Sequence, residues 1–276
     1  MKNEKTKPNI EGLKKGIELA TLVLEGNKSS KKKTYFEENR ELILSFFSDV
    51  NDASKATIMK RLIIIDSFYS TNMSKRLYGI DDLAEAISKL PQGEKLNAML
   101  NTFLADDEKK ISNIFQENYG INKKGDDFGQ AISLISKYFY FFTKYNFPIY
   151  DNLVRNNVNQ VLKAFDIKSF KVKGVELFRG IYKVCKVDYP QIEFAHFDHL
   201  VWLYGKVKYG KIASIITKEQ YLKLITHCEK ELDESFDEQI AKFLANENKI
   251  KELHEEKILD TFLYDFLDWR YKNFLK

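Results

Sequence analysis

The sequence predicts an all-α protein, and two observations carry this prediction. Glycine and proline, which break helices and form tight turns, number only 12 and 4 among the 276 residues. Apolar residues recur at helical spacing, as at Ile132, Ile135 and Phe139. We therefore expect roughly 60% helix or more, in about ten or more helices, with little or no sheet. Phe170 to Val175 is the one candidate for a short strand.

Capping and breaking residues set the expected helix boundaries. Ser54 suits an N-cap, Asp81 and Asp82 carry carboxylates that suit a helix N-terminus, and Pro91 ends a helix. The expected helices are 12–24, 35–47, 54–69, 80–90, 94–104, 106–119, 130–144, 151–165, 172–186 and 192–204, and the charged stretch 217–276 is expected to be helical as well. In this interpretation an N-terminal helix and basic loop occupy 1–34, a large helical core occupies 35–215, and a charged helical region, 216–276, packs on that core.

Composition excludes several classes of protein. The two cysteines, Cys185 and Cys228, are too few for a disulfide framework, a zinc cluster or an iron–sulfur cluster. The longest apolar stretches are too short to span a bilayer, and the charged N-terminus lacks the apolar core of a signal peptide. We therefore expect a cytoplasmic protein with no membrane partner. The net charge of +4 permits DNA binding without requiring it.

A polar turn between two expected helices is the first candidate binding segment. Ser70, Thr71 and Asn72 follow an apolar helix and precede the helix 80–90. Hydroxyl and amide groups at a helix end can contact a phosphate or a base edge in DNA. The alternative is an ordinary αα-corner, in which these side chains only cap helices.

A lysine and an aspartate form the second candidate segment, 136–154. Lys137 lies on an aromatic helix, and Asp151 follows the extended stretch Phe147-Pro148-Ile149-Tyr150 at the start of the next helix. If the extended stretch folds back, the two side chains approach, and a lysine in an apolar wall can act as a nucleophile beside a catalytic carboxylate. The alternatives are that Asp151 is only an N-cap and that Lys137 extends its ammonium group to solvent.

Basic residues and histidines complete the candidate sites. Lys123, Lys124 and Gly125 lie in a glycine-containing loop before a helix, which suits a DNA phosphate, and Lys75 lies near the polar turn. His196 and His199 share one helix face without an obvious third ligand. We therefore expect no metal and no other cofactor.

The order of these segments resembles the helix-hairpin-helix DNA glycosylase superfamily over roughly 61–154. In that superfamily a Ser/Gln/Thr-rich turn precedes an amphipathic helix, as 67–72 does here. A glycine-rich hairpin, a helix and an extended apolar-proline segment then lead to a catalytic aspartate, as 125–151 does here. The resemblance implies an all-α, glycosylase-like helical fold with an extra charged C-terminal region, and it implies that Asp151 is the catalytic carboxylate.

Two features depart from the superfamily pattern. The stretch Gly125-Asp126-Asp127-Phe128-Gly129 differs in spacing and acidity from the usual hairpin. The superfamily's catalytic lysine, where present, would fall within 130–134, so Lys137 is a candidate one turn further along. Without a nucleophilic lysine, water attacks and leaves an abasic site; with one, a Schiff base forms and strand scission can follow.

The resemblance implies a DNA glycosylase that acts on double-stranded DNA, in DNA repair or antiviral defence. The departures favour a specialised or modified base, such as one in invading phage DNA, over uracil or 8-oxoguanine. We expect weak, sequence-independent and salt-dependent binding to DNA. Two alternatives are a catalytically silent DNA-binding protein and a helical protein–protein scaffold, and the sequence names no protein partner. The residues expected to line the base pocket are Tyr69, Asn72, Tyr138, Tyr140 and Tyr150.

Overall fold

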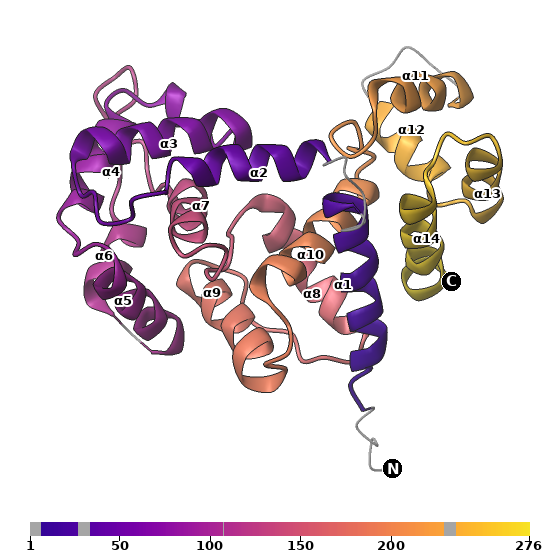
Figure 1. Ribbon diagram of the computed structural model, residues 1–276, viewed down its shortest axis with the longest axis horizontal. Helices are drawn as coiled ribbons and strands as arrows, with labels where there is room; N and C mark the ends of the chain where they lie inside the picture. The colour runs from indigo at the N-terminus through magenta and orange to yellow at the C-terminus, as the bar shows by residue number, and fades with distance from the viewer. Residues whose placement is uncertain (1–6, 27–33, 107, 229–235) are drawn as a thin grey trace. The chain divides into compact units, whose positions relative to one another are not determined.

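The computed structural model describes residues 7–26, 34–106, 108–228 and 236–276, so the expected basic loop at 27–33 lies outside the described residues. Helices account for 67% of the described residues, which confirms the all-α prediction, and Figure 1 shows their arrangement along the chain. Within the described ranges, two isolated bridges are the extent of strand-like pairing: Leu77 with Ile121, and Ile121 with Asp127. None of the described helices is both long and apolar enough to cross a membrane.

The chain divides into two compact units, which we describe separately. The middle unit comprises Asn39–Arg155 and Phe170–Ala195, and the terminal unit comprises Met1–Glu38, Asn156–Ser169 and His196–Lys276. These units differ from the expected division at residues 34 and 215. The reason is that most of α8 (Asn152–Ala164) and α10 (Phe194–Lys208) belongs to the terminal unit, together with both ends of the chain.

Helix α7 (Ile132–Phe142) lies at the core of the middle unit. Every residue from Leu134 to Phe142 is buried, as expected of a helix that is apolar on all sides. Helix α7 packs against α3 (Lys55–Tyr69), which also packs against α4 (Gly79–Ser88). The other helices of this unit are α2 (Tyr35–Ser45, shared with the terminal unit), η1 (Met73–Lys75), α5 (Glu94–Ala105), α6 (Lys109–Gln116), α9 (Val175–Tyr182) and η2 (Lys183–Asp188).

A cluster of phenylalanine rings joins α7 to the extended stretch before α8. The ring of Phe147 lies 5.6 Å from Phe139 and 5.3 Å from Phe178, and Phe115 lies 4.8 Å from Phe178, all measured between centroids. Phe147 has no solvent exposure. Burial of this ring contributes about 2–3 kcal/mol and holds the extended stretch against α7.

The expected strand at Phe170–Val175 is wrong. No strand lies beside this stretch in the described part of the chain, and its first residues are irregular. The Phe170 ring instead covers Gly180 of α9, where an added Cβ atom would lie 2.2 Å from the ring. An aromatic contact, rather than a backbone ladder, therefore orders this segment.

The terminal unit is built around α1 (Ile10–Glu25), α8, α10 and α14 (Thr261–Arg270). Helix α14 packs directly on α1, because Gly16 leaves room for the Trp269 ring; an added Cβ atom would lie 2.3 Å from that ring. Trp269 also stacks on Phe165 at 5.8 Å, and Trp202 of α10 lies 5.8 Å from Phe36. The remaining elements are α11 (Lys218–His227), α12 (Phe236–Phe243), α13 (Glu247–Glu255) and η3 (Tyr271–Leu275).

Side-chain caps explain several helix starts. The Ser54 hydroxyl accepts from the Thr57 N–H and begins α3, as expected, and Asp81 and Asp82 lie in the first turn of α4. Asp260 begins α14 by accepting from the Leu263 N–H at 2.8 Å. The expected helix 106–119 is shorter than predicted, because Glu108 is the N-cap of α6.

Candidate functional site

Ser136 of α7 holds the extended stretch 146–150 against the helix. Its hydroxyl accepts a hydrogen bond from the Tyr150 N–H at 3.0 Å and lies 3.4 Å from the Tyr150 carbonyl oxygen. Ser136 is fully buried, so this backbone contact is shielded from water. Because Tyr150 is held against Ser136, the next residue, Asp151, lies beside Lys137, the residue that follows Ser136 on α7.

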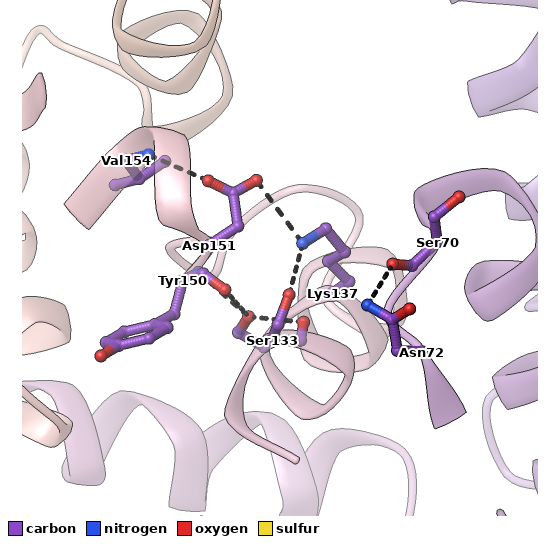
Figure 2. A network of polar contacts seen from close by, with 8 residues as sticks. Ser70, Asn72, Ser133, Lys137, Tyr150, Asp151 and Val154 are labelled. Atoms are coloured by element: carbon purple, nitrogen blue, oxygen red, sulfur yellow. Dashed lines mark hydrogen bonds and ion pairs between the residues drawn. The ribbon is translucent and has the colours of Figure 1, made fainter. Parts of the chain in front are cut away.

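Lys137 and Asp151 meet at this point, as the sequence predicts. The Lys137 ammonium nitrogen lies 3.6 Å from Asp151 Oδ2 (Figure 2). Lys137 is 2% exposed, whereas the Asp151 side chain is 20% exposed. A buried ammonium group requires partners, and the pair meets part of that requirement.

Two further groups surround the Lys137 ammonium. It donates to Ser133 Oγ at 2.9 Å, one helical turn earlier on α7, and it lies 5.3 Å from the centre of the Tyr69 ring. The ring face offers a weak electrostatic attraction to the cation. Ser133, Tyr69 and Asp151 are each half-buried, so the cluster has a buried cation at its base and a partly exposed rim.

Asp151 is the N-cap of α8. Its Oδ1 accepts from the Val154 N–H at 2.9 Å, while Oδ2 faces Lys137. The N-terminal end of a helix carries partial positive charge, so the carboxylate has two positive neighbours, the start of α8 and the Lys137 ammonium. The structure thus supplies the cap that the alternative interpretation requires and also a second, charged contact that capping does not need.

The polar turn begins one residue after Tyr69, next to this cluster. Ser70 and Asn72 adopt left-handed backbone conformations with φ of 48° and 64°, and Asn72 Nδ2 donates to the Ser70 carbonyl at 3.3 Å (Figure 2). The Thr71 hydroxyl donates to the Asp66 carboxylate, which also accepts from the Met73 N–H at 3.2 Å. Thr71 therefore closes the turn, and the exposed Ser70 and Asn72 are its available polar groups.

The loop 120–130 is tied to the same turn region. Leu77 and Ile121 exchange backbone hydrogen bonds at 3.0 Å, and Arg76 donates to the Gly129 carbonyl at 2.7 Å and the Gln130 carbonyl at 3.0 Å. An added Cβ atom on Gly120 would lie 2.7 Å from the backbone of Gly79, so this close approach requires glycine. The lysines that are expected to contact DNA, Lys75, Lys123 and Lys124, therefore lie on two segments that are hydrogen-bonded to each other.

These lysines are exposed but are accompanied by acidic residues. Lys75, Lys123, Lys124 and Gly125 all lie at the surface. The same loop carries Asp126 and Asp127, which offset the charge of its two lysines, and Asp126 is bonded to Asn122. Phosphate contacts from this loop would therefore be weaker than those of an unaccompanied basic patch.

Two of the residues expected in the base pocket lie in the core instead of at the rim. Tyr138 has no exposure and packs on Phe47 at 5.3 Å, and Tyr140 is 2% exposed and lies 4.9 Å from Tyr145. Burial raises the pKa of Tyr138, which also lies within 3.5 Å of Arg61. Tyr69 and Asn72 retain exposure near the cluster, whereas the half-buried Tyr150 points its ring away from Lys137 (Figure 2) and lies 5.8 Å from Phe178.

Ser133 is the site residue that sequence reasoning did not single out. It lies within 130–134, where the superfamily pattern would place a catalytic lysine, and four residues before Lys137 on α7. That i, i+4 spacing was a signal that the two side chains share one helix face. Elsewhere, the rings of His196 and His199 lie 5.8 Å apart, and the described residues contain no group of three metal-ligating side chains.

The comparisons with known proteins identify no relative: no family model, no curated protein and no solved structure matches the chain. The functional interpretation therefore depends on the geometry of the residues described above.

Proposed function

We propose that the protein is a DNA glycosylase that cleaves the N-glycosidic bond of a damaged or modified base. The observation that carries this proposal is the half-exposed Asp151 carboxylate, held at a helix N-terminus and beside a buried lysine. Such a carboxylate is preorganised, because its two oxygens contact the Val154 N–H and the Lys137 ammonium, and Ser136 holds the backbone of the preceding residue. A preorganised negative charge is suited to a reaction in which positive charge develops.

The proposed reaction develops such a charge on the deoxyribose. As the bond from C1′ to the base nitrogen breaks, its electron pair leaves with the base, which takes up a proton, and the sugar becomes oxocarbenium-like. The ionised Asp151 stabilises that sugar, and a water oxygen then forms the new bond to C1′. The water gives up its proton to the carboxylate or to solvent, and an abasic site remains.

In this proposal Lys137 is the charge partner of the Asp151 carboxylate and does not attack the sugar. An ammonium group has no free electron pair, and this one is 2% exposed with Ser133 and Asp151 as neighbours. Schiff-base formation would require the amine to lose its proton and to leave both partners. We therefore propose that water attacks and that the DNA strand is not cut.

Double-stranded DNA would approach over the tied turn and loop. In this proposal Lys75, Lys123 and Lys124 contact phosphates, and the target base is flipped toward the rim formed by Tyr69 and Asn72. The loop lysines are partly offset by Asp126 and Asp127, which fits a specialised enzyme with weak general DNA affinity. We propose a modified base, such as one in phage DNA, as the substrate class.

The test is base excision on a panel of duplexes that carry different modified and damaged bases, with abasic sites detected by alkaline cleavage. We expect abasic sites on at least one modified base and little activity on uracil or 8-oxoguanine. An intact panel, under conditions in which the protein binds those duplexes, would refute the enzymatic proposal.

A catalytically silent DNA-binding protein is the second candidate. The observation that favours it is that both Asp151 oxygens already have protein partners, Val154 N–H and Lys137. In that case the cluster only stabilises the start of α8. Salt-dependent binding to every duplex of the panel, with no excision from any, is the outcome that distinguishes it.

A further inference from the structure

Arg270 of the terminal unit is a buried cation with unused donors. It is the last residue of α14, at the point where the helix widens into the π-helical turn η3. It is 3% exposed, and its Nε and Nη1 have no hydrogen-bond partner among the described residues. Burial also lowers the pKa of the guanidinium. Short π-helical segments are frequent at functional sites.

Arg61 of the middle unit shows how this chain treats a structural arginine. Arg61 is 1% exposed, and its three nitrogens donate to the backbone carbonyls of Phe46, Asp49 and Asp52. All three guanidinium nitrogens of Arg61 therefore donate to the backbone of one segment, 46–52. Arg270, equally buried, has no such set of acceptors, so its unmet donors require another explanation.

The surroundings of Arg270 supply a second cation and several polar groups. The guanidinium carbon lies 5.9 Å from the centre of the Tyr204 ring, and the Tyr204 hydroxyl donates to Gln160 Oε1 at 3.4 Å. The Lys208 ammonium donates to the same oxygen at 2.8 Å and lies 3.5 Å from Asn157 Oδ1. These residues come from α8, α10 and α14, and all belong to the terminal unit.

No described carboxylate forms an ion pair with Arg270 or Lys208. Two exposed lysines near the C-terminus differ in this respect: Lys251 pairs with Glu247, and Lys272 pairs with Asp268. The cluster extends from the exposed Gln160 and the half-buried Lys208 to the buried Asn157 and Arg270. It therefore combines two positive charges that have no carboxylate partner in the described residues, and its Gln160 end is exposed.

We propose that Arg270, Lys208, Tyr204 and the two amides form a binding site for a phosphate group. The planar guanidinium offers its Nε and Nη1 N–H groups as donors to an anion, which then meets two positive charges, one from Arg270 and one from Lys208. The bound anion supplies the acceptors that Arg270 lacks. This site is separate from the Asp151 cluster and does not depend on the proposed glycosylase activity.

The test is thermal unfolding of the full-length protein during titration with inorganic phosphate, with sodium chloride at matched ionic strength as the reference. Wild type should show a saturable rise in Tm of about 2–6 °C, because a ligand that binds only the native state stabilises it. Arg270→Met should remove the rise and, without phosphate, should unfold at or above the wild-type Tm, because it deletes an uncompensated buried charge. Lys272→Met, the matched control on the next exposed turn, should retain the full rise.

A second Arg270 variant and a second anion, acetate, complete the experiment. If Arg270→Met does not fold, Arg270→Lys keeps the charge without the planar pair of donors, and it should weaken phosphate binding at least tenfold by calorimetry. No saturable rise in wild type, or an unchanged rise in both Arg270 variants, would overturn the proposal. If acetate raised the Tm in an Arg270-dependent way and phosphate did not, the site would bind carboxylates. That result would overturn the phosphate assignment.

Discussion

Asp151 combines two roles at the residue scale: its Oδ1 caps α8 and its Oδ2 faces Lys137. Capping is common in this chain, and Asp260 provides the same cap for α14 with no ion pair in the described residues. The two aspartates therefore form a natural pair for experiment. What distinguishes Asp151 is the contact with Lys137, and the proposed chemistry depends on the carboxylate.

We expect Asp151→Asn to abolish most base excision while the protein remains folded. Asparagine still accepts from the Val154 N–H, but it removes the negative charge, so excision should fall by about 10²–10³-fold or more. Loss of the charge partner of Lys137 should also cost about 1–3 kcal/mol of unfolding free energy. Asp260→Asn, which changes only a cap, should cost less than about 0.5 kcal/mol and leave excision unchanged. Excision by folded Asp151→Asn at the wild-type rate would exclude the carboxylate from catalysis.

Lys137 should not form a covalent bond with DNA. Borohydride treatment during excision traps a Schiff base, and we expect no trapped adduct with wild type because the ammonium is held by Ser133 and Asp151. Lys137→Met should lower excision by about tenfold, less than Asp151→Asn, because Asp151 keeps its helix contact. A trapped adduct that disappears in Lys137→Met would instead identify a nucleophilic lysine.

At the element scale, the contact between α11 and α13 contains a titrating pair. His227 Nδ1 faces the Lys223 carbonyl, and Nε2 faces the Glu256 carboxylate just after α13. The backbone contact, followed by the carboxylate, raises the pKa of His227 above its usual value. A raised pKa in the folded protein means that the contact is strongest below the ordinary histidine pKa and is lost as pH rises through the folded value.

Raising the pH from about 5.5 to 8.5 should therefore loosen α11 against α13. We expect faster hydrogen exchange in 218–227 and 247–255 at the higher pH after correction for intrinsic rates, with α1 and α14 unaffected. In the His227→Gln variant, the corrected hydrogen-exchange rates of these two segments should not change over this pH range. Equal pH dependence in wild type and His227→Gln would show that another group controls this contact.

The sequence predicted most elements and part of the site, for identifiable reasons. Pro148 and its apolar neighbours indicate an extended segment before a helix, and that segment brings Asp151 to Lys137. Ser133 and Ser136 were not singled out, because a serine has many roles and only the fold-back over α7 gives these two their partners. Arg270 lies in a strongly charged stretch that suggests exposure, and only packing of α14 shows that it is buried.

At the scale of the whole molecule, DNA affinity depends on how charge is distributed, since the net charge is only +4. Neutralising Lys123 and Lys124 together by substitution with glutamine should weaken duplex binding about three- to tenfold at low salt and lower the salt dependence of the binding constant. Asp126→Asn with Asp127→Asn should strengthen binding, because these carboxylates repel phosphate from the same loop. A loop that does not contact DNA would leave affinity unchanged in both double variants, as measured by fluorescence anisotropy.

Both tryptophans of the chain, Trp202 and Trp269, belong to the terminal unit. Tryptophan emission during urea denaturation therefore reports on the unit that contains Arg270 and is blind to the unit that contains Asp151. Loss of the proposed excision activity would report on the middle unit. If the urea midpoint from tryptophan emission differs from the midpoint from activity, the two units unfold independently. One shared midpoint would indicate a single cooperative transition.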